Sequence, residues 1–197
     1  MRRCDFYENI TIDRAGAVYC HASSPTIEAC TFHHNHAEGI GGAMVIEEGS
    51  SPHLISCTFH RNVGLHGCQI TCGWNSGVPC RPVLENCILA FGEESVAFAC
   101  VAGVCEPTLA CCDIYGNEGG DWTGCIADQL GVDGNIRLDP LLCDAGNQDF
   151  TLEDCSPCTP FSPPNAECDL IGAHPVGCGG SPATSASWGR VKSLFRK

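Results

Sequence analysis

The sequence predicts an all-β solenoid, a single-stranded parallel β-helix of about five coils followed by an irregular C-terminal capping segment. The first observation behind this prediction is a phrase, S-S-P-T-I-E-A-C-T-F-H-H-N at 23–35, that returns at intervals of 25 to 30 residues. The second is that positions inside the phrase keep a fixed register while the spacers vary, which is typical of solenoids. The third is that the apolar segments are short, β-branched or aromatic, and bounded by turn residues, so they predict strands.

Each copy of the repeat is counted from a proline. The prolines are Pro25, Pro52, Pro82 and Pro107. An apolar residue follows two places later and a cysteine five places later. Because this separation is odd, the two cannot face the same side of one straight strand, and we expect a bend between them. Glycine-rich segments at 16–20 and 42–46 predict a third short strand in each coil.

The repeat phrase resembles that of right-handed parallel β-helices of the broad pectate-lyase-like and polymorphic-outer-membrane-protein type. The matching letters are S-S-P-x-I-x-x-C-T-F-x-x-N with a following G-G-A, and they cover residues 1 to 120. In that family, asparagines stacked at the corners form side-chain ladders. The resemblance assigns this role to Asn9, Asn35, Asn62 and Asn117, with Gly92 as a gap. The alternative is that each asparagine only favours a left-handed turn conformation.

The 18 cysteines fall into two groups and favour an oxidising, extracytoplasmic setting. The first group repeats at an inward position, about 4.8 Å apart from coil to coil, which is poor geometry for disulfides. We therefore expect small buried hydrophobic residues at Cys4, Cys30, Cys57, Cys87 and Cys112. The second group brackets loops and supplies candidate disulfides, namely Cys72, Cys80, Cys100, Cys105, Cys155, Cys158, Cys168 and Cys178.

The spacing leaves the pairing of the second group open. Local bridges could join Cys72 to Cys80 and Cys100 to Cys105. Alternatively, Cys80 and Cys105, which both lie two places before a repeat proline, could pair across neighbouring coils. For the single C-x-x-C unit at 155–158 we favour a disulfide over zinc, because no second such unit is present.

Three regions follow from these patterns. Residues 1–120 carry the repeats, residues 121–178 form a terminal coil with a disulfide-rich cap, and residues 179–197 form a flexible linker and basic tail. Within 135–158 the order D-P-L, D-F-x-L and S-P-C resembles the closing segment of bacterial β-helix repeats, which implies that it covers the open end of the core. The chain begins in the middle of a repeat and has no signal peptide, so we expect it to be the C-terminal part of a secreted protein.

The net charge and its distribution limit the classes of partner that the chain could bind. The net charge of −13 makes nucleic acid an improbable ligand and opposes a groove for polyanionic sugars. The basic tail at 188–197 has helical spacing of apolar residues, so it could associate with an acidic envelope surface or simply dock on the solenoid. No apolar run is long enough to span a membrane.

Few residues suggest chemistry. His33 and His60 occupy equivalent positions in neighbouring coils, and as a stacked pair on an outer face they are the candidate binding residues; the alternative is a solvated corner. The turns at 133–135 and 144–149 have oxygen ligands suited to Ca²⁺, but turns are acidic for backbone reasons as well. No catalytic residue, no metal site and no cofactor is predicted.

Two functions remain. The first is a non-enzymatic extracellular or cell-surface module, which is structural, adhesive, or binds a polysaccharide or protein ligand that the sequence does not identify. The second is a polysaccharide lyase or glycoside hydrolase on the same scaffold. We favour the first because an enzyme needs its cationic and imidazole groups close together. Apart from His33 and His60, these groups do not occupy equivalent positions in neighbouring repeats.

Overall fold

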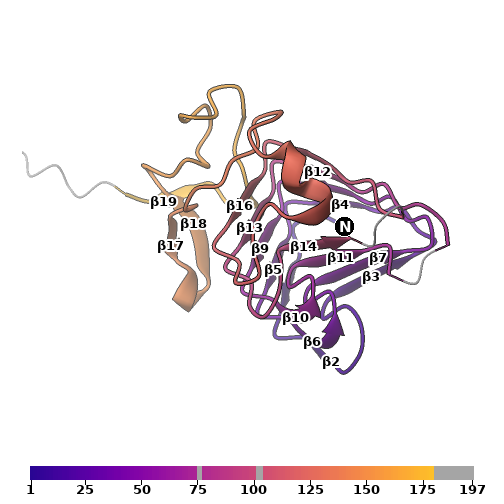
Figure 1. Cartoon of the computed structure of the whole chain (residues 1–197). Helices are drawn as coiled ribbons and strands as arrows, with labels where there is room; N and C mark the ends of the chain where they lie inside the picture. The colour runs from indigo at the N-terminus through magenta and orange to yellow at the C-terminus, as the bar shows by residue number, and fades with distance from the viewer. Residues whose placement is uncertain (75–76, 101–103, 180–197) are drawn as a thin grey trace, which may run out of the picture.

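The computed structural model describes residues 1–74, 77–100 and 104–179, and within them the chain winds as a parallel β-solenoid of about six turns (Figure 1). The longest sheet has five strands, and the sixth turn adds Ile136, which forms an isolated parallel bridge with Asp113. The predicted fold class is thus confirmed, with about six turns in place of the expected five. No helix in the described part of the chain is long and apolar enough to cross a membrane.

Four parallel sheets form the wall, one more than the three strands expected in each coil. The longest, which we call the docking sheet, contains β1 (Asp5–Tyr7), β5 (Thr31–His33), β9 (Thr58–His60), β13 (Ile88–Ala90) and β16 (Asp113–Tyr115). The unexpected sheet contains β2 (Ile10–Thr11), β6 (His36–Ile40) and β10 (Val63–His66). It was missed because its strands follow the ladder asparagines, where the spacers vary in length and sequence.

The other two wall sheets come from the segments on which the repeat was defined. One contains β3 (Val18–His21), β7 (Met44–Glu47), β11 (Ile70–Cys72) and β14 (Phe98–Cys100). The other contains β4 (Thr26–Glu28), β8 (His53–Ile55), β12 (Val83–Glu85) and β15 (Thr108–Ala110). After the wall come η1 (Gly124–Gln129), β17 (Leu142–Asp144), η2 (Ala145–Asn147), β18 (Asp149–Glu153) and β19 (Val176–Cys178).

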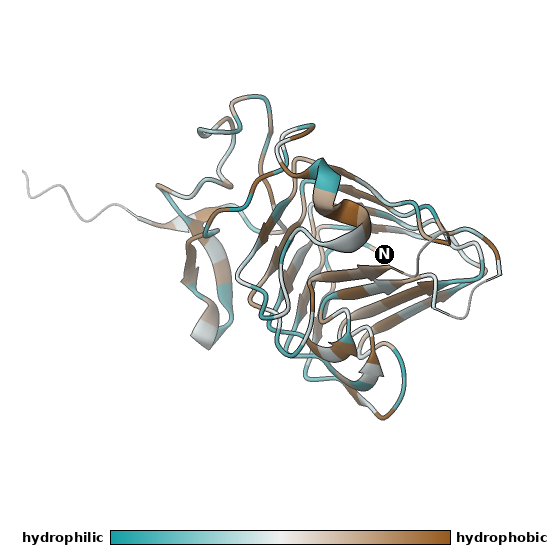
Figure 2. Cartoon of the chain, viewed as in Figure 1, coloured by the Kyte–Doolittle hydropathy of each residue, from teal (hydrophilic) through white to brown (hydrophobic). Residues whose placement is uncertain are grey.

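Side chains at one repeat position stack through the core along the solenoid. In the docking sheet Phe6, Phe32 and Phe59 are register partners, and their rings stack at centroid distances of 4.8 and 4.5 Å. The wall strands include many residues of high hydropathy, drawn brown in Figure 2. The bend between the two halves of the phrase lies at Ala29, Ser56, Asn86 and Cys111, each with φ near +50°.

The repeated cysteines line the same core. Four of them are fully buried, whereas Cys4 in the first coil is exposed. Each sulfur is a thiol within hydrogen-bonding distance of the carbonyl oxygen two residues earlier, as between Cys30 and Glu28 at 3.3 Å. The stacked thiols therefore pack as small apolar groups whose weak donors are satisfied by the backbone of their own turn.

The ladder asparagines are joined by side-chain hydrogen bonds along the solenoid axis. Asn9 donates to Asn35 at 2.8 Å, and Asn35 donates to Asn62 at 2.9 Å. Left-handed φ values fall on the residues just before, His34 and Arg61, so turn preference does not account for the asparagines. At the predicted gap, Gln69 takes over the ladder.

Gln69 links Asn62 to Asn117 across the coil that carries Gly92. Its Oε1 accepts from Asn62 at 2.6 Å, and its Nε2 donates to Asn117 Oδ1 at 3.1 Å. A Cβ on Gly92 would lie 2.2 Å from the sulfur of Cys68 and 2.7 Å from Gln69 Nε2. Glycine is required there because the bridging amide and a buried thiol occupy the space of a side chain.

The end of the core is closed by residues just after the repeats. Trp122 and Ile126 pack into the core cluster, and η1 carries Ile126 across the last turn. By contrast, the segment at 135–158, expected to cover this end, continues past Ile136 onto the outer face of the docking sheet (Figure 1). The segment that resembles the closing segment does form ordered structure, but the predicted position was wrong. Its apolar residues can pack on the outer face of a sheet as well as on the open end of the core.

Candidate functional site

The candidate site is the outer face of the docking sheet together with the segment that covers it, residues 139–178, which we call the docked segment. Two rows of side chains point outward here because strand residues alternate in direction. The first row is Asp5, Thr31, Thr58, Ile88 and Asp113, and the second is Tyr7, His33, His60, Ala90 and Tyr115. The repeat phrase thus sets inward residues uniformly but leaves the outward rows varied in chemistry.

The docked segment follows the first row from coil to coil. Gly172 N donates to the Asn86 carbonyl at 2.8 Å, and Ala173 N donates to Thr58 Oγ1 at 2.9 Å. His174 Nε2 then lies 2.7 Å from Thr31 Oγ1. Successive residues therefore contact successive coils, and the covered strip runs toward the first coil.

The candidate binding histidines, His33 and His60, lie beneath this segment. Phe150 of β18 packs on both rings, at centroid distances of 4.8 Å to His33 and 5.3 Å to His60. Their exposures are 0% and 4%, so neither the accessible stacked pair nor the solvated corner expected from the sequence is present. The expectation failed because alternation shows that a side chain points outward but not that another segment covers it.

Burial sets the charge state of these imidazoles. Desolvation, followed by the nearby His34, lowers the pKa of His60 to about 3, and desolvation also lowers the pKa of His33. His33 Nδ1 lies 3.0 Å from His34 Nδ1, and His33 Nε2 lies 3.3 Å from Asp5 Oδ1. Both buried histidines are neutral at pH 7, and Phe150 of the docked segment therefore packs on two uncharged rings.

A pocket of about 290 Å³ remains where the covered strip ends at the first coil. Thr31, Phe150 and His174 line its inner side, and Arg3, Asp5 and Gln148 complete it. It contains a hydroxyl–imidazole pair beside a carboxylate and a guanidinium. Burial lowers the pKa of His174, so its ring can accept the hydrogen bond from Thr31.

A second pocket, of about 390 Å³, is lined by residues of the solenoid and of the docked segment. His60 and Phe91 form its floor, while Arg61, Asp139 and Glu153 lie around it. Both pockets have mixed charge, so neither is a basic groove for a polyanion.

The described residues include no group of three or more His, Cys, Asp or Glu side chains placed to hold a metal ion. Side-chain oxygens of the two acidic turns accept hydrogen bonds from protein groups. Asn147 Nδ2 donates to Asp144 Oδ2 at 2.7 Å, and Asp149 Oδ1 accepts from the Thr151 backbone at 3.1 Å. Asn135 of the other turn accepts from Cys112 N at 2.9 Å.

The disulfides differ from the pairings that the spacing suggested. Instead of closing local loops, they join Cys72 to Cys105, Cys100 to Cys125, Cys111 to Cys168, and Cys143 to Cys178. Cys80 and Cys105 are backbone neighbours, but the sulfur of Cys80 faces the Ile46 carbonyl at 3.8 Å. Bridges therefore run between coils, because coiling brings residues 25 to 33 places apart side by side.

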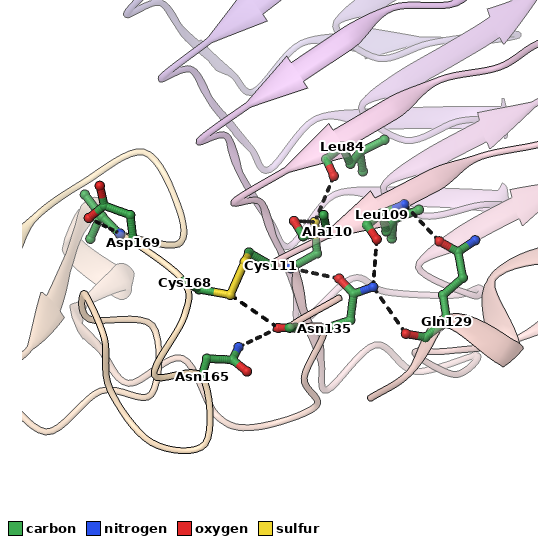
Figure 3. Close-up of a disulfide and its surroundings, with 12 residues drawn as sticks. Leu84, Leu109, Ala110, Cys111, Gln129, Asn135, Asn165, Cys168 and Asp169 are labelled. Carbon is green, nitrogen blue, oxygen red and sulfur yellow. Dashed lines mark hydrogen bonds between the residues drawn. A yellow bond between two sulfur atoms is a disulfide. The ribbon is translucent and has the colours of Figure 1, made fainter. Parts of the chain in front are cut away.

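One bridge fastens the docked segment to the solenoid. Cys111 sits at a bend of the last repeat, and Figure 3 shows its bond to Cys168 beside Asn135 and Asn165. Asn165 donates to the Gly134 carbonyl at 2.5 Å. The structure holds Cys155 and Cys158 as thiols, so the disulfide expected between them is not present.

Sequence reasoning missed two residues of this region. Asp113 is a buried outward residue in the row of Asp5, Thr31, Thr58 and Ile88, and its Oδ1 accepts a hydrogen bond from Leu138 N at 3.1 Å. Phe150 had been assigned only to the closing segment. An acidic residue directly before the inward apolar position of Ile114 was the available signal for Asp113, whereas nothing local predicts that Phe150 meets the histidines. The basic tail lies outside the described residues.

Comparison with known proteins agrees with the solenoid fold. Residues 1–136, more than two thirds of the 197, match the family described as the right handed beta helix region. Comparisons with curated proteins and with solved structures gave no match. The matched residues end at Ile136, where the last turn of the solenoid passes to the docked segment. The chain belongs to the right-handed β-helix family.

Proposed function

We propose that this chain is a non-enzymatic extracellular or cell-surface module of a bacterial β-helix protein, of the broad pectate-lyase-like type, that serves structure, adhesion or binding of a polysaccharide or protein. The observation that carries the proposal is the docked segment, which occupies the outer face of the docking sheet and buries His33 and His60. A long substrate cannot lie along that strip while the segment is in place. Beside His174 and beside His60, the openings of about 290 and 390 Å³ are short pockets and not a continuous groove.

The cross-coil disulfides support the extracellular part of the proposal. Four bonds link coils or fasten the C-terminal region, and such bonds persist in oxidising compartments. The charge of −13 agrees with a surface that repels polyanionic substrates.

The alternative, a polysaccharide lyase or glycoside hydrolase, has one observation in its favour. Thr31 and His174 meet at 2.7 Å in a pocket that also contains Asp5 and Arg3. A hydroxyl beside an imidazole is the arrangement of an activated nucleophile. An enzyme on this scaffold would therefore use this pocket, and its activity would depend on His174.

A cleavage screen separates the two functions. The full chain, with and without Ca²⁺, is incubated with polygalacturonate and with neutral polysaccharides, and unsaturated and reducing ends are measured. We expect no turnover above that of a His174→Ala variant, with His66→Ala as the matched control at an exposed histidine. Turnover that persists in His66→Ala and disappears in His174→Ala would overturn the proposal in favour of the enzyme.

A further inference from the structure

The turn after β18 carries two thiols in a C-x-x-C arrangement, Cys155-Ser156-Pro157-Cys158. Cys155 is exposed, whereas Cys158 has 0% exposure against the docking sheet. Two short turns shape the segment, with Ser156 N donating to the Glu153 carbonyl at 3.1 Å and Thr159 N donating to the Ser156 carbonyl at 3.2 Å. One thiol is thus accessible to an outside reagent, and the other is three residues away and shielded.

The shielded thiol has a buried acid beside it. Cys158 Sγ lies 3.2 Å from Asp113 Oδ2, and Asp113 also has 0% exposure. Asp113 Oδ1 is held by Leu138 N at 3.1 Å, which fixes the carboxyl group in place. Burial raises the pKa of Asp113 to about 7, and burial and then Asp113 itself raise the pKa of Cys158. A carboxylate with a pKa near neutrality is suited to accept a proton there.

The exposed thiol lies among acids. Cys155 Sγ is 3.6 Å from Glu153 Oε2. Desolvation, followed by Glu153 and Asp154, raises the pKa of Cys155. A thiol of raised pKa is a poor leaving group, and its disulfide is favoured over its thiolate. This environment favours release of electrons from the pair.

We propose that Cys155 and Cys158 form a reactive dithiol that reduces an external disulfide, with Asp113 accepting the proton of Cys158. The Cys155 thiolate attacks one sulfur of the external disulfide, forms a mixed disulfide and releases the first thiolate. Cys158 then attacks the Cys155 sulfur, gives its proton to Asp113, and releases the second thiolate. The dithiol loses two electrons and the external disulfide gains them. Each chain therefore delivers one pair of electrons.

This capacity is separate from the proposed module function. It requires only the turn, the docking sheet and an accessible disulfide as oxidant. The exchange is stoichiometric, so it does not make the chain a polysaccharide-cleaving enzyme.

The test uses oxidised glutathione as the external disulfide and the full chain with Cys4→Ser, which removes the other exposed thiol. The protein is first treated with a mild dithiol, desalted, mixed with oxidised glutathione, quenched with acid, alkylated and analysed by peptide mass spectrometry. We expect one internal Cys155–Cys158 bond and two glutathione thiols released per chain. The rate should rise with pH, since Cys155 attacks as its thiolate.

Three variants assign the steps. Cys158→Ser keeps a donor toward Asp113 and should accumulate glutathione on Cys155, whereas Cys155→Ser should not react because Cys158 is shielded. Asp113→Asn should leave the first step unchanged and slow the second by about 10²-fold, with loss of its pH dependence near 7. Circular dichroism and unfolding curves identify any variant that fails to fold, in which case the Cys155 variant alone decides the first step.

Two outcomes would overturn the proposal. In one, the parent accumulates the mixed disulfide as Cys158→Ser does, which would show that Cys158 does not resolve it. In the other, the isolated protein carries a Cys155–Cys158 bond that the mild dithiol cannot open, which would make it a structural bridge. Neither outcome bears on the polysaccharide screen.

Discussion

The two faces of the docking sheet are built by opposite rules. Its inner face stacks like on like, as Phe6, Phe32 and Phe59 show, so each coil repeats the packing of the last. Its outer face puts Asp5, threonines, Ile88 and Asp113 in one row, and non-repeating residues of the docked segment meet each of them differently. The repeated inward residues determine the solenoid fold, and the non-repeated outward residues determine how the docked segment binds to it.

The largest expected effect lies on the inner face. Phe59→Ala should destabilise the chain by about 3–5 kcal/mol, because it removes a fully buried ring and leaves a cavity between coils. Phe32→Ala should behave alike. Urea unfolding followed by circular dichroism measures the loss, with Leu65→Ala as the control at a side chain that is 56% exposed. Unfolding midpoints equal to that of Leu65→Ala would show that the ring stack does not support the solenoid.

The outer face should respond to pH. The unfolded state binds a proton at His60 between pH 6.5 and about 3 while the folded state does not, so stability is lost as pH falls through this window. The shift corresponds to at most about 5 kcal/mol. Asp113 acts in the opposite direction: its folded pKa is about 7 against 3.8, so its contribution is lost as pH rises from 3.8 to 7.

The two groups therefore offset each other between pH 4 and 6.5, and variants should separate them. The free energy of unfolding of Asp113→Asn should fall steadily as the pH is lowered from 7 to 4, because only the effect of His60 remains. In His60→Phe this decrease toward low pH should be absent. His66→Phe, at an exposed histidine, is the control. Denaturant unfolding at pH 4, 5.5 and 7 measures both slopes. If Asp113→Asn and the parent have the same slope, Asp113 is ionised in the folded state and the burial argument is wrong.

Detachment of the docked segment should have a smaller and more local effect. The double variant Cys111→Ser, Cys168→Ser removes the bridge to the last coil and should cost about 2–4 kcal/mol. Hydrogen exchange should then rise in 139–178 and at His33 and His60, with little change in β7 and β11 at the opposite wall. A uniform rise through all coils would show that docking and solenoid unfold together, and the two regions would no longer be distinguishable.

The sequence predicted what depends on the repeat and missed what depends on contacts between distant segments. Bends at Ala29, Ser56 and Asn86 followed from parity of spacing, and the structure places left-handed residues there. Burial of His33 and His60 did not follow, because Phe150 lies about 90 to 120 residues later and shares no pattern with them. A cross-coil disulfide was one of the alternatives left open, but the pairs that form, Cys72 with Cys105 and Cys100 with Cys125, were not identified, since spacing along the chain does not show which sulfurs face each other.

The smallest effect concerns the place where the repeat itself is broken. Gln69→Ala should cost about 1–3 kcal/mol, because in a buried setting Asn62 Nδ2 loses one of its two acceptors, at 2.6 Å, and the Ala90 carbonyl loses one of its two donors, at 3.0 Å. Gln69→Glu is the matched control: it keeps the acceptor for Asn62 but replaces the donating amide. It should cost at least as much as alanine, because a buried carboxylate would face the Ala90 carbonyl and Asn117 Oδ1. Urea unfolding of the three proteins orders them, and hydrogen exchange at Gly92, whose N–H donates to Asn117 Oδ1 at 2.9 Å, reports the ladder directly. If both variants leave stability and this exchange rate unchanged, the amide is not what carries the ladder across the coil of Gly92.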